Sequence, residues 1–257
     1  FWSTDLSLHN PHEFDLTVVV QALHSERENF EVPTLNLTLG PWQNINLWDV
    51  LGPGDLDFEG TDAILVYADP GLSCNPIEEC HFLATSRTYT PNGSGGTGEF
   101  GLTVAGSGVE RGVDWDGLAY AAGILNDGRH FRCNAGVASW TADWTTVRLD
   151  IQDAGGGVLA SEYFDVPPFG HVQRRLETEV EGGSLVFYLE AGPGDAVVFP
   201  YATVINQETG DGSYSAAVSS AVGASVAKTS EASSRRPPHP SAPAAAVSGR
   251  SADPPTR

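Results

Sequence analysis

Two histidines and a glutamate lie close together near the start of the chain, in "LSLHNPHEFDL" (residues 6–16). Imidazole nitrogens and carboxylate oxygens bind zinc, so His9, His12 and Glu13 are candidate metal ligands. A working zinc site needs three or four ligands and a supporting shell of hydrogen bonds, and only these three can be pointed to. Asn10-Pro11 is a turn-forming pair. We therefore predict a turn between two strands here, and no metal site.

A second candidate for ion binding is the acidic stretch "DLDFEGTD", Asp55 to Asp62. Alternating carboxylates can direct several oxygen atoms at one calcium ion. The stretch lacks the length and the closing bidentate glutamate of an EF-hand loop, so we interpret it as a solvated acidic loop. Calcium is the one cofactor left open, and no other is expected.

The sequence contains no motif for nucleophilic catalysis. The "GSG" at 106–108 lacks the strand-to-helix setting of a nucleophile elbow. With 33 Asp and Glu residues some carboxylate pair is inevitable, so a glycosidase cannot be inferred from their number. We predict no catalytic residues and no enzymatic activity. A hydrolase whose carboxylates meet only in the folded chain is the remaining enzymatic alternative.

Several large aromatic residues lie in or beside the expected strands. Aromatic rings at such positions commonly fill the cores of β-sandwiches. We interpret them as core residues and not as a platform on which sugars stack. They are Trp2, Trp42, Trp140, Trp144 and Phe169.

The three cysteines allow two interpretations. Cys74 and Cys80 enclose five residues, and a small local disulfide is feasible there outside the reducing cytosol. Cys133 would then be a free thiol. The alternative is three unpaired thiols, with Cys133 as a small buried hydrophobic residue.

Composition and charge narrow the class of protein. The chain has 29 glycines, 17 prolines and one lysine, Lys228, which favours strands and turns over long helices. The formal charge of −20 makes nucleic acid an unsuitable partner, because nucleic acid is bound by a basic surface. No apolar run is long enough to span a membrane. The chain begins at Phe1 and lacks methionine, so we expect a processed or trimmed product that is secreted or displayed on a cell surface.

The two halves of the chain can be aligned with each other. "WSTDLSLHNPHEFDLTVVV" from Trp2 falls on "FRCNAGVASWTADWTTVRL" from Phe131, an offset of 129 residues. Farther on, Pro41-Trp42 overlies Pro168-Phe169 at an offset of 127, "EGTDAILVY" overlies "EGGSLVFYL" at 122, and Ala84 overlies Ala202 at 118. The order of the matched segments never changes, which indicates an internal repeat.

Each half consists of short alternating runs separated by Gly, Pro, Asn and Asp, the pattern of an antiparallel β-sandwich. We expect a first sandwich at 1–95, a Gly-rich linker at 96–114 that could itself contain a short strand, a second sandwich at 115–213, a candidate donor strand at 214–228 and an extended Pro/Ala/Ser-rich tail at 229–257. The expected strands are 3–9, 15–23, 34–39, 42–48, 62–68, 82–89, 117–124, 132–138, 145–151, 158–166, 169–176, 184–190, 196–206 and 214–222.

This pattern resembles the tandem immunoglobulin-like β-sandwich modules of uncharacterised secreted bacterial proteins. The resemblance depends on "WSTDLSLHNP", "SRTYTPNGSGGTG" and "FPYATVINQETGDGSY", each a strand with its turn, and covers residues 1 to about 214. It implies an architecture and brings no catalytic residues.

The ends of the chain suggest how copies could associate. The second sandwich opens with "GLAYAAGIL" (117–125), for which the first shows no counterpart, so the first sandwich is expected to expose a sheet edge. We predict Phe1 to Leu8 as this acceptor edge and Tyr214 to Lys228 as a strand donated by another copy. A closing strand of its own sandwich is the alternative for 214–228.

These features together predict a secreted structural protein that assembles head to tail, by strand donation, into an extracellular filament or surface layer. Its partners would be copies of itself. The tail at 229–257 has four arginines and two acidic residues, which suits docking onto an acidic neighbour. The alternative is a cell-surface adhesive or carbohydrate-binding module pair that does not self-assemble.

Overall fold

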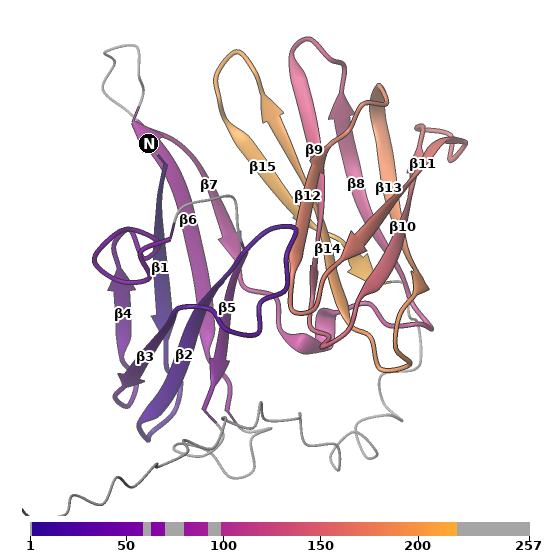
Figure 1. The fold of residues 1–257 in the computed structure, drawn as a ribbon. Coiled ribbons are helices and arrows are strands. Elements are labelled where there is room, and N and C mark those ends of the chain that lie inside the picture. The colour runs from indigo at the N-terminus through magenta and orange to yellow at the C-terminus, as the bar shows by residue number, and fades with distance from the viewer. Residues whose placement is uncertain (1, 59–62, 70–79, 92–98, 220–257) are drawn as a thin grey trace, which may run out of the picture. The chain divides into compact units, whose positions relative to one another are not determined.

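The computed structural model describes residues 2–58, 63–69, 80–91 and 99–219. These residues form antiparallel β-sheets joined by turns, with one 3₁₀ turn at Val109–Arg111 and no α-helix in the described part of the chain (Figure 1). The predicted all-β class is therefore confirmed. The tail at 229–257 lies outside the described residues.

The first half of the chain forms two sheets, sheet A and sheet B. Sheet A contains, in spatial order, β4 (Asn44–Leu47), β1 (Ser3–His9), β6 (Leu83–Pro91) and β7 (Glu99–Ala105). Sheet B contains β3 (Thr34–Leu39), β2 (Leu16–Leu23) and β5 (Ala63–Ala68).

The second half also forms two sheets, sheet C and sheet D. Sheet C contains β12 (His171–Arg175), β9 (Phe131–Ser139), β14 (Val198–Asn206) and β15 (Gly212–Ala216). Sheet D contains β11 (Val158–Val166), β10 (Thr145–Gln152), β13 (Val180–Ala191), β8 (Leu118–Asn126) and β16 (Val218–Ser219).

Each half buries its own apolar core, and each core draws side chains from both sheets of that half. Alternate residues of a strand point to opposite faces, so the inward residues of paired sheets meet. The first core includes Leu6, Leu8, Leu16, Val18, Val20, Leu39, Val50, Leu56 and Phe58. The second includes Cys133, Ala135, Val137, Val147, Leu149, Ile151, Phe164, Leu185 and Phe187.

The strand order supports the internal repeat. Sheet A (β4-β1-β6-β7) has the same order as sheet C (β12-β9-β14-β15), and sheet B (β3-β2-β5) matches the first three strands of sheet D (β11-β10-β13). Only β8 and β16 have no counterpart among the described strands of the first half.

Strand pairing changes two of the four predicted alignments. Val66 pairs with Val20, and Phe187 pairs with Leu149, the counterpart of Val20, so the offset is 121 and not 122. Likewise Ser86, not Ala84, corresponds to Ala202. The first error matters more, because a shift of one residue exchanges the core face and the solvent face of a strand.

The Gly-rich stretch predicted as a linker at 96–114 contains β7, which pairs with β6 along its whole length. This part of the stretch therefore belongs to sheet A. The composition obscured the strand, because glycine is a poor strand former and Gly101 lies opposite Tyr89 at close range.

Candidate interaction site at the edge of β5

The strand β5 is an edge of sheet B. It pairs with β2 from Leu23↔Ala63 to Val18↔Ala68, and no described strand pairs with its other side (Figure 1). Every residue of β5 is half-buried. An unpaired edge carries a row of free N–H and C=O groups that can template another strand.

The corresponding strand of the second half, β13, shows what covers such an edge. β13 pairs with β10 on one side and with β8 on the other. Opposite Leu185 and Phe187, β8 places Ala121 and Ala119, and all four side chains are buried. Small inward residues of β8 thus close the core over the large residues of β13.

The counterparts of Leu185 and Phe187 on β5 are Ile64 and Val66, which pack on the first core but remain half-buried. Leu185 and Phe187, in contrast, are 0% exposed. The edge of β5 therefore leaves apolar side chains uncovered as well as main-chain groups unpaired by any described strand.

The direction of the free main-chain groups follows from one hydrogen bond. Asp69 N donates to Thr17 O at 2.9 Å, so the groups of Asp69 face β2. In an antiparallel pair this orientation alternates along the strand. The N–H and C=O groups of Ile64, Val66 and Ala68 therefore point away from β2, toward the open side.

The predicted acceptor edge at Phe1 to Leu8 is wrong. β1 lies inside sheet A, where it pairs with β4 on one side and with β6 on the other. The prediction assumed that the opening strand of a sandwich covers the strand next to it in sequence. In the second half the opening strand, β8, instead pairs with β13 in the other sheet from β9, and the counterpart of β13 in the first half is β5.

Part of the predicted donor strand at 214–228 is already paired within the chain. Residues up to Ala216 belong to β15, which pairs with β14, and Val218–Ser219 form β16, which pairs with β8. Ala217 between them is buried in the second core. The alternative of a closing strand therefore holds for 214–219, and residues 220–228 lie outside the described residues.

The candidate zinc ligands lie at a turn that one amide organises. Asn10 is fully buried, and its Nδ2 donates to the carbonyl oxygens of Phe14, Leu39 and Gly40 at 2.7, 3.1 and 3.0 Å. Its Oδ1 accepts a hydrogen bond from His12 N at 3.0 Å. The predicted turn is therefore present, and Asn10 stabilises it.

His9, His12 and Glu13 do not converge. His12 stacks on Phe14 with ring centroids 4.6 Å apart, and its Nε2 contacts the main chain of His81. Among the described residues, no three His, Cys, Asp or Glu side chains come together as a metal site.

The described part of the acidic stretch, Asp55 to Phe58, supplies core residues as well as carboxylates. Leu56 and Phe58 are buried in the first core, while Asp55 and Asp57 are exposed. Asp57, between these two core residues, has a positive φ of 46°. Residues 59–62 of the predicted loop lie outside the described residues.

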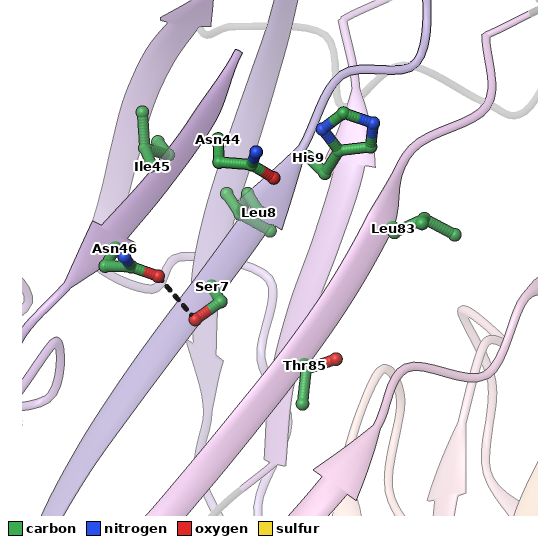
Figure 2. A pocket seen from close by; sticks show the side chains of 8 residues that line it. All are labelled: Ser7, Leu8, His9, Asn44, Ile45, Asn46, Leu83 and Thr85. Carbon is green, nitrogen blue, oxygen red and sulfur yellow. Dashed lines mark hydrogen bonds between the residues drawn. The ribbon is translucent and has the colours of Figure 1, made fainter. Parts of the chain in front are cut away.

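A shallow pocket of about 170 Å³ lies on the outer face of sheet A (Figure 2). The side chains of Ser7, His9, Asn44, Asn46 and Thr85 give it a polar lining, and Ser7 Oγ donates to Asn46 Oδ1 at 2.7 Å. His9 Nδ1 is buried and has no hydrogen-bond partner. No Trp, Tyr or Phe lines the pocket, so it offers hydrogen bonds without a surface for stacking.

The prediction that the aromatic residues fill the core is wrong for three of them. Trp2, Trp42 and Trp144 are 62%, 58% and 54% exposed. Trp140 and Phe169 are half-buried and contact each other edge to face, with ring centroids 6.1 Å apart. The cores are filled mainly by aliphatic side chains together with Phe58, Phe164 and Phe187, whereas Trp2, Trp42 and Trp144 lie outside the strands.

The cysteines differ in state. Cys133 is a free thiol in the second core, and burial raises its pKa to about 12. Cys80 is disulfide-bonded. Cys74 lies outside the described residues.

Sequence reasoning missed a buried polar cluster around His171. The ring of His171 is 2% exposed; its Nδ1 lies 2.8 Å from Ser25 Oγ and its Nε2 lies 2.6 Å from the Tyr201 hydroxyl. Tyr201 donates its own proton to Gln173 Oε1 at 2.6 Å. Burial lowers the pKa of His171 to about 4 and raises that of Tyr201. A neutral ring that accepts from Ser25 and donates to Tyr201 satisfies all three contacts.

Comparison with protein-family models, curated proteins and solved structures found no match to the chain. Within the described part of the chain, no helix has the length and apolar character that a membrane crossing requires.

Proposed function

We propose that the chain is a secreted, non-enzymatic structural protein made of two tandem immunoglobulin-like β-sandwiches that assemble head to tail into a filament or surface layer. The open edge of β5 carries this proposal, because it combines outward main-chain groups with half-buried Ile64 and Val66. Strand addition at such an edge supplies main-chain hydrogen bonds for affinity and side-chain pockets for specificity.

The donor would be residues 220–228 of another copy, "SAVGASVAK". Like β8, this segment consists mainly of small and β-branched residues, and β8 covers β13 with the small side chains of Ala119 and Ala121. A donor with small side chains at these positions would fit over Ile64 and Val66.

A contact of this kind is heterologous, because the donor and the acceptor are different surfaces. Heterologous contacts that do not close into a ring generate open polymers. The proposal assigns no catalytic residue and no cofactor, and the tail at 229–257 would lie against the acidic neighbour. Calcium is not needed for it.

The test compares the full chain with two variants by negative-stain microscopy and light scattering. A chain ending at Ser219 lacks the donor, and Ala68→Pro removes an outward N–H from β5 at little cost in side-chain volume. We expect filaments from the full chain and folded monomers from both variants. A chain ending at Lys228, which keeps the donor and loses the tail, is the matched control and should still assemble.

Discrete particles from the full chain at every concentration would overturn the proposal. Filaments from the chain ending at Ser219 would show that residues 220–228 are not the donor. Filaments from Ala68→Pro would show that β5 is not the acceptor. Circular dichroism establishes that each variant is folded.

The polar pocket on sheet A favours the second candidate function, a carbohydrate-binding module. Hydroxyl-rich ligands are oriented by side chains such as those of Asn44, Asn46 and Thr85. A glycan array with wild type and Asn44→Ala tests it, and binding that the substitution abolishes would favour this function. The missing aromatic lining makes it the weaker candidate.

A further inference from the structure

Within the chain, the loop after β2 contacts the turn before β12. We call residues 24–30 the docking loop and residues 167–171 the aromatic turn. Ser25 forms an isolated parallel bridge with His171, at the edge of sheet C, and Ser25 Oγ lies 2.8 Å from His171 Nδ1. The loop thus continues the sheet at its open side.

Two main-chain donors of the docking loop fix its position. Glu26 N donates to His171 O at 2.8 Å, and Asn29 N donates to Pro168 O at 3.1 Å. Beyond them, Phe30 contacts Phe169 edge to face, with ring centroids 5.8 Å apart. The contact therefore consists of two main-chain hydrogen bonds, the side-chain hydrogen bond between Ser25 and His171, and one aromatic pair.

The docking loop is held in its binding shape by its own residues. Asn29 is 5% exposed; its Nδ2 donates to the carbonyl oxygens of His24 and Arg27, and its Oδ1 accepts from His24 N. A loop ordered in this way loses little entropy on binding.

The first half contains the same aromatic turn, at Gly40 to Asn44. Trp42 takes the place of Phe169, and both residues have a positive φ, 57° and 46°, which bulky residues rarely adopt. Equivalent hydrogen bonds hold both: Trp42 N donates to His12 O, as Phe169 N donates to Thr141 O.

The acceptors for a docking loop are repeated as well. Asn44 replaces His171, and Pro41 replaces Pro168, at the same offset of 127. Gln43 O accepts from Asn10 N, so the carbonyl of Asn44 faces the opposite direction, toward the open edge of β4. Trp42 is 58% exposed, and no described residue covers it as Phe30 covers Phe169.

Among the described residues, neither half of the chain supplies a loop for this turn. The docking loop is already bound to Phe169. Its counterpart in the second half, residues 153–157, has the sequence "DAGGG" and no aromatic residue. The described residues thus leave the turn at Trp42 without the loop that covers its counterpart, Phe169.

We propose that the turn at Trp42 is a docking site for another β-sandwich module, whose loop after its second strand presents an aromatic ring and two main-chain N–H groups to Trp42, Pro41 and Asn44. This surface is distinct from the edge of β5.

The test uses a cyclised peptide with the sequence of residues 23–31, "LHSERENFE", as the loop. Its affinity for the full chain is measured by microscale thermophoresis, at concentrations at which light scattering finds monomers. We expect saturable binding that Trp42→Ala weakens at least about tenfold, as for an aromatic hot spot. Trp144→Ala, which removes another exposed tryptophan, is the matched control and should leave the affinity unchanged.

A peptide in which alanine replaces the residue equivalent to Phe30 should bind at least about tenfold more weakly than the original. Equal binding to wild type and Trp42→Ala would overturn the proposal, as would the absence of binding up to about 1 mM peptide. The peptide result is independent of filament formation, which concerns β5.

Discussion

Single polar side chains organise both halves of the molecule. Asn10 is fully buried and donates to three carbonyl oxygens, one at Phe14 and two at Leu39 and Gly40, far along the chain. Buried carbonyls without a partner destabilise the folded state. The turn therefore depends on the amide of Asn10, whose two N–H bonds are shared among these three acceptors.

Asn10→Ala should lower the free energy of unfolding by about 2–3 kcal/mol, because it leaves buried acceptors unpaired. Urea unfolding followed by tryptophan fluorescence measures this change. Asn46→Ala on the exposed face of the same sheet is the control, with an expected change below about 0.5 kcal/mol. A similar loss in both variants would contradict the role of Asn10.

His171 should make stability depend on pH. Its pKa is about 4 in the folded chain and about 6.5 when unfolded, so protons bind the unfolded chain more readily between these values. The contribution of the neutral ring to the free energy of unfolding is therefore complete above about pH 6.5. It falls by up to about 3 kcal/mol as the pH falls to about 4.

The measurement is urea unfolding of wild type and His171→Gln from pH 7 to pH 4. Glutamine can keep the contacts with Ser25 and Tyr201 but does not titrate in this range. The stability difference between the two proteins should therefore shift by up to about 3 kcal/mol in favour of the variant. A difference that stays constant over this range would show that His171 is not buried as a neutral ring.

At the scale of the strands, the sequence predicted where strands lie along the chain better than it predicted which strand forms the open edge of a sheet. Alternation placed most strands to within a few residues, because the burial of one face is a local property of sequence. The acceptor edge could not be predicted from the alternation of apolar and polar residues. β5 corresponds to β13, the strand that β8 covers, and this correspondence is set by pairings between strands distant in sequence.

The candidate site was only partly predictable for the same reason. Comparison of the two halves predicted an open edge in the first half, and among its described strands none corresponds to β8. The cluster of Ser25, His171 and Tyr201 was not, since its members lie 146 and 30 residues apart and carry no motif. Trp42 was misread because a turn with positive φ gives no signal in hydrophobic alternation.

The pairing of β15 and β16 predicts how far the chain can be shortened. A chain ending at Ser213 loses most of β15, all of β16 and the buried side chain of Ala217. We expect its thermal unfolding temperature to fall by several degrees relative to the chain ending at Ser219, as a loss of about 2 kcal/mol would produce. Equal unfolding temperatures would mean that these strands do not stabilise the second half.

At the scale of the whole molecule, charge sets the conditions under which association can occur. Residues 1–228 carry a formal charge of −22, since the last 29 residues contribute +2. Repulsion between such bodies is screened over about 10 Å at 0.1 M salt and reaches farther in dilute buffer. A head-to-tail assembly of this chain therefore has to be sought at moderate ionic strength.

The buried thiol of Cys133 can report local opening of the second half of the chain. Its thiol is sealed in the core and resists ionisation, so an alkylating reagent cannot modify it in the closed state. Modification at this sulfur, identified by peptide mapping, reports each transient opening without any engineered label. The rate of Cys133 alkylation thus measures how often the second half opens in its native state.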